Sequence, residues 1–278
     1  MLENGKWQKN IGILITSHRG NRAYLRGCLE THMKLGYWIT VMYDNPYESS
    51  FHHLNHNDLL PPIDLIGMMD TFVIPHHQTW GGVLYPYFWL LNLGGELLQN
   101  FEYIYCINGD MIIEKPEGFP KLLELLGDGD IMGVGPDRKD VKRCFNTAGF
   151  ISKTEAFRAI MKHFKERLIP LEAYEKYTQE SGNTEARFDR AIIDLGLNQV
   201  TVPVFPPDEQ IRVKGIGTWY DLVGFRHIHA EHTQAYRTRG IPPELKYLDK
   251  RFMGGEYNII EKYWETKDEE ILKGWWAK

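Results

Sequence analysis

The sequence has few cysteines. It contains three in 278 residues, and no two of them form a Cys-x-x-Cys pair. This count excludes the class of small secreted domains that depend on several disulfides, and the spacing excludes a cysteine-rich zinc module. The N-terminal segment MLENGKWQKN is polar and lacks the apolar core of a signal peptide. We therefore expect a cytoplasmic protein with reduced thiols.

Long apolar runs and an excess of positive charge are also lacking. No stretch approaches the roughly 20 apolar residues that span a bilayer, so no transmembrane segment is expected. The formal net charge is −5, which does not indicate a uniformly basic nucleic-acid-binding surface. Hydrophobic residues make up 43% of the chain, which is enough for a sizeable core. The composition is that of a globular protein without repeats or low-complexity tracts.

The order of apolar segments predicts an α/β fold. Residues 11–16 (IGILIT) form a short β-branched run, residues 21–35 have helical spacing that ends at Gly36, and residues 38–43 (WITVMY) form a second run. A β-α-β order implies parallel strands with a crossover helix between them. Further strands are expected at 71–74, 103–107, 130–134 and 200–204, and further helices at 83–99, 116–126, 154–167 and 185–195. The prediction from these segments is a single α/β domain with parallel strands and connecting helices.

Polar residues follow the expected strands where ligands bind in such folds. Asn108-Gly109-Asp110 comes directly after the run YIYCI, and ligands of open α/β sheets bind outside the carboxyl ends of the strands. A carboxylate there can meet a hard cation and a diphosphate, so Asp110 is a candidate metal ligand. Asn-Gly-Asp is also common turn chemistry, and that interpretation remains open.

Two other loops carry candidate ligands for a nucleotide. Thr16, His18 and Arg19 follow the first strand, and the arginine can pair with phosphate, although it can also be simply solvated. Asp44 lies just past the second strand, where Asp-Asn-Pro is equally consistent with an ordinary turn. Backbone beside the pair Gly81-Gly82, which follows Trp80, can approach a ligand closely.

The sequence resembles GT-A glycosyltransferases of the large family-2 type. The resemblance covers roughly residues 11–232, and it is carried by the order of five segments: IGILITSHR, WITVMYDN, FEYIYCINGD, FNTAGFISKTEAF and TEARFDRAIIDLG. It implies a single α/β domain of the GT-A type at about 1–240, with a Rossmann-like, mixed, mostly parallel sheet flanked by helices. The nucleotide-sugar half would be at about 1–110 and the acceptor half at about 111–240. A helical tail is expected at 241–278. The family's Asp-x-Asp motif is Asn108-Gly109-Asp110 here, which leaves Asp110 as the main carboxylate ligand of Mn²⁺ or Mg²⁺.

The resemblance also implies roles for the other candidates. Thr16, His18, Arg19, Asp44, Asn108 and the Trp80-Gly81-Gly82 loop would contact the donor, with a UDP-sugar as the favoured donor. A C-terminal histidine, His229, would be a second metal or phosphate ligand.

Either Glu185 or Asp189 would be the general base for the acceptor hydroxyl in an inverting reaction. They are four residues apart at the start of a helix and can share one face. Acids in a first helical turn also complement the helix dipole, which is the structural alternative.

The expected function is therefore metal-assisted transfer of a hexosyl or pentosyl group from a nucleotide sugar to a hydroxyl acceptor. One alternative is a catalytically degenerate scaffold that binds nucleotide sugars or saccharides, which the loss of the first Asp of the motif favours. A nucleotidyltransferase is a further alternative, although SHRGNRAYLRG has only scattered glycines where that class needs a glycine-rich phosphate loop. The acceptor is either a saccharide or, as in phage, modified DNA.

Overall fold

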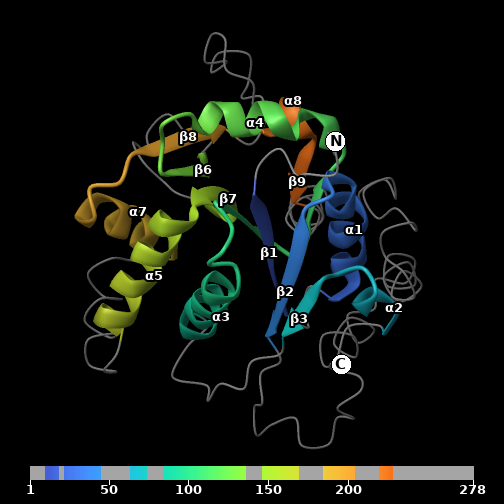
Figure 1. Cartoon of the computed structure of the whole chain (residues 1–278), viewed down its shortest axis with the longest axis horizontal. Coiled ribbons are helices and arrows are strands. Elements are labelled where there is room, and N and C mark those ends of the chain that lie inside the picture. Colours follow the sequence, from blue (N-terminus) through green and yellow to red (C-terminus); the bar gives the residue numbers. More distant parts are fainter. Residues whose placement is uncertain are drawn as a thin grey trace, which may run out of the picture.

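The computed structural model describes residues 10–18, 22–44, 63–73, 84–135, 146–168, 184–203 and 219–227. They form a seven-stranded sheet with helices on both faces (Figure 1). The strand order is β3 (Thr71–Val73), β2 (Trp38–Asp44), β1 (Ile11–His18), β4 (Tyr103–Asn108), β7 (Asn146–Lys153), β6 (Ile131–Gly135) and β8 (Gln199–Pro203).

The sheet is mixed and mostly parallel. β1, β2, β3 and β4 pair in parallel, and β6 pairs in parallel with β8. Within this sheet only β7 runs in the opposite direction, since it is antiparallel to both β4 and β6. The predicted fold class is confirmed, whereas the expected tail at 241–278 lies outside the described residues and the domain division remains a prediction.

No strand was predicted at β7 and no helix at α2 (Ile63–Ile66). Three other elements were also not predicted from the sequence. β5 (Met111–Ile113) and β9 (Phe225–His227) form a separate antiparallel ribbon, and α8 (Trp219–Val223) directly precedes β9. These segments are too short for a periodic pattern to distinguish them from loops. The ribbon nevertheless matters, because it ties a late part of the chain to the turn that follows β4.

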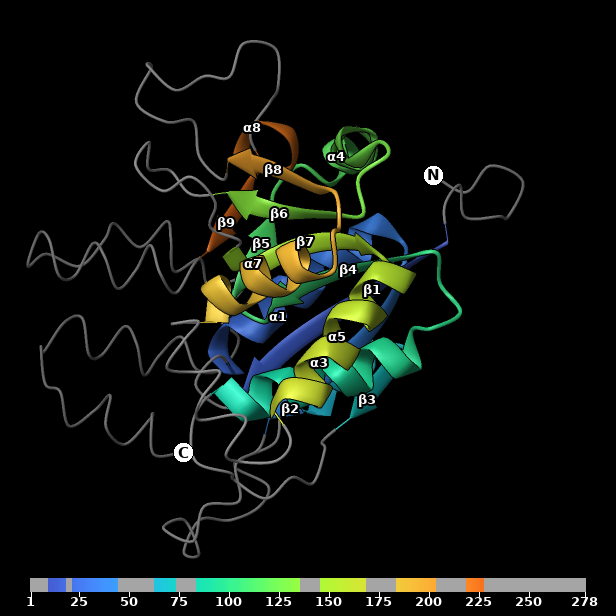
Figure 2. The same cartoon turned by 90° about the vertical axis from the view of Figure 1, so that its left-hand side faces the viewer.

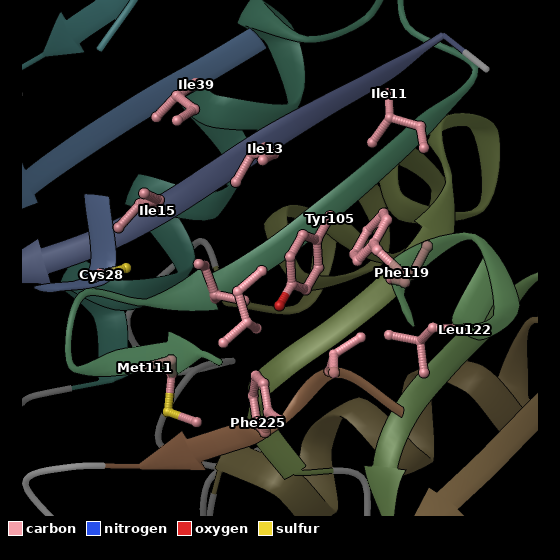
Figure 3. Packing of buried hydrophobic residues seen from close by; sticks show 14 of the residues in the cluster. Ile11, Ile13, Ile15, Cys28, Ile39, Tyr105, Met111, Phe119, Leu122 and Phe225 are labelled. Atoms are coloured by element: carbon pink, nitrogen blue, oxygen red, sulfur yellow. The ribbon is translucent and has the colours of Figure 1, made fainter. Parts of the chain in front are cut away.

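Alternating side chains divide the core into two layers. Ile13 and Ile15 of β1 face the layer shown in Figure 3, whereas Leu14 faces the other layer. The first layer is covered by α1 (Arg22–His32), α4 (Phe119–Leu126) and α8, and the second by α3 (Leu84–Leu97), α5 (Thr154–Leu168) and α7 (Thr184–Asp194). Figure 2 shows α3, α5 and α7 together on one side of the sheet. The remaining short helices are α2 (Ile63–Ile66), η2 (Met33–Leu35) and η5 (Pro116–Gly118).

A glycine allows α3 to lie close to β1. A Cβ atom at Gly94 would meet Leu14 Cδ1 at 2.4 Å, well inside van der Waals contact. Gly94 therefore brings the helix backbone onto the sheet rather than interrupting the helix. Within the described residues, α3 and every other helix are too short or too polar to cross a membrane.

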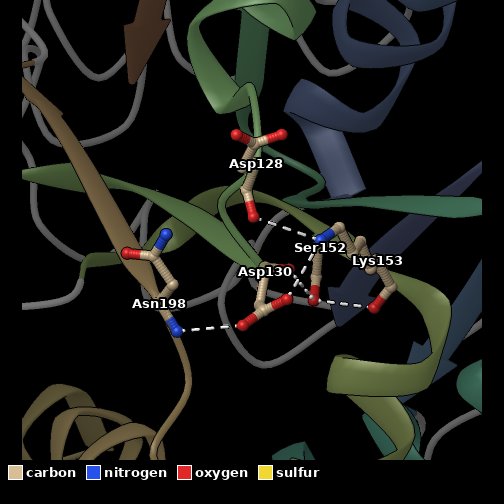
Figure 4. Close-up of polar contacts among 5 residues, drawn as sticks. All are labelled: Asp128, Asp130, Ser152, Lys153 and Asn198. Atoms are coloured by element: carbon tan, nitrogen blue, oxygen red, sulfur yellow. Dashed lines mark hydrogen bonds and ion pairs between the residues drawn. The ribbon is translucent and has the colours of Figure 1, made fainter.

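A polar cluster fixes the amino ends of β6 and β8 (Figure 4). Asp130 Oδ2 accepts the backbone N–H of Asn198 at 2.9 Å, and Asp130 Oδ1 lies 3.1 Å from Lys153 Nζ. Ser152 Oγ donates to the Asp130 carbonyl at 3.2 Å. The hydrogen bond from Asn198 and the nearby Lys153 charge together hold the pKa of Asp130 below its usual value, despite partial burial. Asp130 therefore joins three segments that are distant in the sequence.

We expect Asp130→Ala to lower the free energy of unfolding by about 1–2 kcal/mol, because it removes a charge-assisted hydrogen bond to the backbone. Lys153→Met should cost less, on the order of 0.5 kcal/mol, because the ion pair is partly exposed. Urea denaturation of both variants measures the difference. Equal decreases in the free energy of unfolding of the two variants would contradict the prediction that the hydrogen bond from Asn198 contributes more than the ion pair with Lys153.

Candidate active site at the carboxyl edge of the sheet

The carboxyl ends of β2, β1 and β4 lie side by side. His18 is paired with Asp44 across β1 and β2, and Thr16 is paired with Asn108 across β1 and β4. Four of the residues predicted to bind the donor thus lie at one edge of three adjacent parallel strands. For His18 and Asp44 this placement refers to the backbone, since the structure does not describe their side chains.

Thr16 orients the side chain of Asn108. The Thr16 hydroxyl donates to Asn108 Oδ1 at 3.1 Å, with the Ile107 carbonyl as a second acceptor at 3.4 Å. The backbone N–H of Gly109 donates to the Thr16 carbonyl at 2.8 Å, which extends the pairing of β1 with β4 by one residue. Thr16 is buried and Asn108 is half-buried. The start of the Asn-Gly-Asp turn is therefore held by β1.

Gly109 fits a position where a side chain has no room. A Cβ atom there would lie 2.6 Å from Ser17 Oγ and 2.8 Å from Ser17 Cβ, and Ser17 is itself buried. Both distances are shorter than ordinary contacts, so a larger residue would push the turn away from β1. The glycine thereby allows the chain to pass from β4 to Asp110 close to the first strand.

Asp110 is buried, with 3% of its surface exposed, and lies near α1. Burial is the main cause that raises the pKa of Tyr24 and the pKa of Cys28, and the negative charge of Asp110 raises both further. Tyr24 lies in the first turn of α1, where the partial positive charge of the helix N-terminus favours an anion. Asp110 is thus shielded from bulk solvent and lies within electrostatic reach of Tyr24 and Cys28 on α1.

The β5–β9 ribbon brings a later segment of the chain to Asp110. Met111, the next residue, is paired with His227 at the end of β9. His229 comes two residues after His227 and lies outside the described residues, so its predicted role as a ligand remains a prediction. The described part of the chain reaches the residue next to Asp110 at His227.

A buried cluster formed by His32, Cys28 and Tyr105, next to the Asn108 carbonyl, was not identified from the sequence. His32 is fully buried, and its Nδ1 lies 2.7 Å from the Cys28 carbonyl, which requires Nδ1 to carry the proton. His32 Nε2, then unprotonated, accepts from the Tyr105 hydroxyl at 3.3 Å. Cys28 Sγ contacts the Asn108 carbonyl at 3.7 Å. The spacing of four between Cys28 and His32 is the only sequence signal that places them on one face of α1.

The two candidate bases are in different surroundings. Asp189, in the middle of α7, is largely buried, and Gln199 Nε2 donates to its Oδ1 at 3.5 Å. Gln199 lies in one row of the sheet with Ile131, Ser152 and Ile104. Within β4, Ile104 is four residues before Asn108. Glu185 lies in the first turn of α7, but its side chain is not described.

The remaining predicted donor-binding residues cannot be located in the structure. Arg19, Trp80, Gly81 and Gly82 lie outside the described residues, as does His229. A cavity of about 340 Å³ lined by described residues lies at the opposite, amino edge of the sheet, where Asn10 and Phe101 precede β1 and β4 and Trp38 begins β2. The candidate site lies at the carboxyl edge because the described residues predicted to bind the donor are paired there.

The donor atoms at the turn suit a hard cation. Asp110 supplies a carboxylate, Asn108 an amide oxygen and Thr16 a hydroxyl, and Mg²⁺ and Mn²⁺ favour such oxygen ligands. In the part of the chain that the structure describes, no three His, Cys, Asp or Glu side chains group to hold a metal. The oxygen groups at the turn are of the kind that Mg²⁺ and Mn²⁺ bind together with phosphate and water.

The chain is similar in fold to solved structures of two kinds of enzyme. The galactosyltransferase LgtC, in complex with donor and acceptor sugar analogues, is 14% identical with a TM-score of 0.41, and the alignment covers 69% of this chain and 73% of LgtC. A protein described as a nucleotide-diphospho-sugar transferase from Desulfovibrio desulfuricans G20 is 10% identical with a TM-score of 0.45, and covers 96% of this chain and 99% of its own.

The second kind of enzyme transfers a nucleotidyl group. A 4-diphosphocytidyl-2C-methyl-D-erythritol synthase from Anaerococcus prevotii is 12% identical with a TM-score of 0.44, and covers 70% of this chain and 89% of its own. No family model matches the sequence, and no curated protein matches it. Glycosyltransferases are thus among the structures of similar fold, as the resemblance implies, but similarity at this level does not decide between the two activities.

The buried histidine predicts a pH-dependent stability. Burial lowers the pKa of His32 from 6.5 to about 4, and the hydrogen bond to the Cys28 carbonyl opposes this shift only in part. Below pH 6.5 the unfolded chain binds a proton that the folded chain excludes, so the free energy of unfolding falls as the pH falls towards 4. From about pH 7 to about pH 5 the titration of His32 should lower the free energy of unfolding by about 2 kcal/mol.

His32→Gln provides the comparison, because it removes this titration. Urea denaturation of both proteins at the two pH values should show a shallower pH dependence for the variant, whatever its absolute stability. Parallel pH profiles would show that His32 is already solvated or protonated in the folded protein.

Proposed function

We propose that this chain is a glycosyltransferase, which moves a sugar from a nucleotide-sugar donor to a hydroxyl acceptor at the carboxyl edge of β2, β1 and β4. The observation that supports it most is the convergence of Thr16, Asn108 and the buried Asp110 on one turn, beside the ends of β1 and β2. Ligands of open α/β sheets bind at this edge. Polar oxygen ligands grouped beside a helix N-terminus suit a diphosphate and its cation.

Within this proposal, Asp110 and Asn108 hold Mn²⁺ or Mg²⁺ when it is bound, and the cation neutralises the charge of the diphosphate leaving group. Thr16 keeps the Asn108 amide turned towards β1 through its hydroxyl hydrogen bond. Asp44 and His18, paired at the ends of their strands, flank the nucleoside, and Arg19 contacts phosphate. Each of these residues binds or orients the donor, with a UDP-sugar as the favoured donor.

Glu185 is the better candidate for the general base. α7 ends shortly before β8 begins, so it runs back towards the amino ends of the strands. Glu185, one turn before Asp189, is therefore nearer to the carboxyl edge by roughly 6 Å. Asp189 accepts a hydrogen bond from Gln199 at the other end of β8. In the proposed inverting reaction Glu185 accepts the proton of the acceptor hydroxyl as that oxygen attacks the sugar.

The role of Asp110 predicts a large effect of an isosteric change. Asp110→Asn should lower turnover of nucleotide sugars by about 100-fold or more, since the carboxylate that holds the cation is lost. Asp128→Asn is the matched control, because its side chain is exposed after α4, and it should retain full turnover. Product formation from a panel of nucleotide sugars with added Mn²⁺ measures both, after thermal unfolding confirms that each variant is folded.

Near-normal turnover by Asp110→Asn would exclude Asp110 as the essential ligand. If the unmodified protein is stabilised by a nucleotide sugar in thermal unfolding but transfers and hydrolyses none, the binding-scaffold alternative is correct. Nucleotide-sugar formation from a nucleoside triphosphate and a sugar phosphate would instead identify a nucleotidyltransferase.

The choice between the two acids gives a second test. Glu185→Gln should lower kcat by about 10²–10⁴-fold and change the donor KM little, as expected for loss of a general base. Asp189→Asn should keep kcat within about threefold, because an amide oxygen can still accept the hydrogen bond from Gln199. The reverse pattern would assign the base to Asp189.

A further inference from the structure

We infer that the cavity at the amino edge of the sheet binds a small organic ammonium ion. The cavity has a volume of about 340 Å³ and is bounded by the starts of β1 and β2, by η2 and by the segment that leads into β3. This volume lies within the range of sites that hold small molecules, roughly 300–1,000 Å³. Twelve residues line it, and the structure describes all of their side chains.

The walls of the cavity are aromatic and sulfur-containing. Trp38 is 44% exposed and Met33 45% exposed, although both belong to residue types that are usually buried. The rings of Trp38 and Phe101 have centroids 6.4 Å apart and are tilted by 43°. Met68 and Met69 complete the apolar lining. Thioether sulfur is polarisable and adapts its contacts to different ligands.

The charge of the lining selects the class of ligand. Among the twelve residues Asp70 is the only charged one, and there is no Lys, Arg or His. The faces of the aromatic rings carry negative potential, which adds to the charge of this carboxylate. An anion would be repelled, and a purely apolar ligand would leave the carboxylate without a counter-charge. A cation with apolar substituents satisfies the rings and the carboxylate together.

The carboxylate is held in position by the backbone. Asp70 Oδ2 accepts the N–H of Ile39 at 2.7 Å, and the N–H of Asp70 donates to the Ile39 carbonyl at 2.9 Å. This reciprocal pair joins the start of β2 to the segment before β3. Within the described part of the chain no Lys, Arg or His forms an ion pair with Asp70. The negative charge is thus fixed at the cavity before any ligand arrives.

This site is independent of the proposed function. It lies at the amino ends of the strands, whereas the candidate active site lies at their carboxyl ends, and β1 spans roughly 20 Å between the two edges. The outcome of the ligand-binding test at the amino edge therefore does not bear on the activity proposed at the carboxyl edge. The proposed ligand is a primary or quaternary alkylammonium ion.

The experiment compares tert-butylammonium with tert-butanol, which has nearly the same shape and no charge. Each is titrated into the full chain while the ¹³C-methyl signals of Met33, Met68 and Met69 are followed, after assignment by single Met→Leu variants. Tert-butylammonium should shift these signals and bind at least about fivefold more tightly than the alcohol. Trp38→Leu should weaken its binding by a similar factor.

Asp70→Asn isolates the charge, because the amide oxygen can still accept the Ile39 N–H and the strand start is preserved. It should weaken tert-butylammonium binding by about fivefold and leave the alcohol unaffected, whereas Asp128→Asn should change neither. Equal affinity for the two probes, an unchanged affinity in Asp70→Asn, or shifts confined to methionines outside the cavity would overturn the inference. So would the absence of any shift with tert-butylammonium.

Discussion

β1 pairs in parallel with β2 on one side and with β4 on the other, and the arrangement of the candidate site depends on this double pairing. The pairing aligns residues from three separate parts of the chain, since His18 lies opposite Asp44 and Thr16 lies opposite Asn108. A shift of one residue in either pair would turn the side chains at the strand ends to the other face. The two core layers prevent such a shift, because Leu14 and Ile15 belong to opposite layers.

The buried Asp110 is electrostatically linked to α1. Its negative charge raises the pKa of Tyr24 and the pKa of Cys28, both of which are raised mainly by their own burial. The same helix contacts the turn region through Cys28 at the Asn108 carbonyl and through His32 at the Tyr105 hydroxyl. The position of Asp110 is therefore coupled to the packing of α1, and a neutral His32 is part of that packing.

The two edges of the sheet differ in chemistry. The carboxyl edge between β1 and β4 carries polar oxygen groups, with the buried Thr16 hydroxyl bonded to the Asn108 amide and the buried Asp110 carboxylate two residues further along. The amino edge beside β1 and β2 has a cavity with aromatic and methionine walls and one fixed carboxylate. Farther along the same amino edge, Asp130 is fully used in joining Asn198 and Lys153. At the amino edge, Asp130 is therefore structural, whereas Asp70 is the carboxylate that we propose binds a ligand.

The sequence by itself determined the fold class, because the β-branched runs and the helical spacing between them repeat over the length of the chain. It also placed Asn108, Asp110 and Asp44 beside the ends of their strands, whereas Thr16 and His18, expected after the first strand, lie within β1. Only the tertiary structure decided that β7 is antiparallel, that β9 returns to Asp110, and that Asp189 contacts Gln199. The buried partners of His32 and the cavity at Trp38 were decided there too. Local patterns report the periodicity of one segment, whereas these features arise where segments distant in the sequence meet, and no pattern within a single segment encodes such contacts.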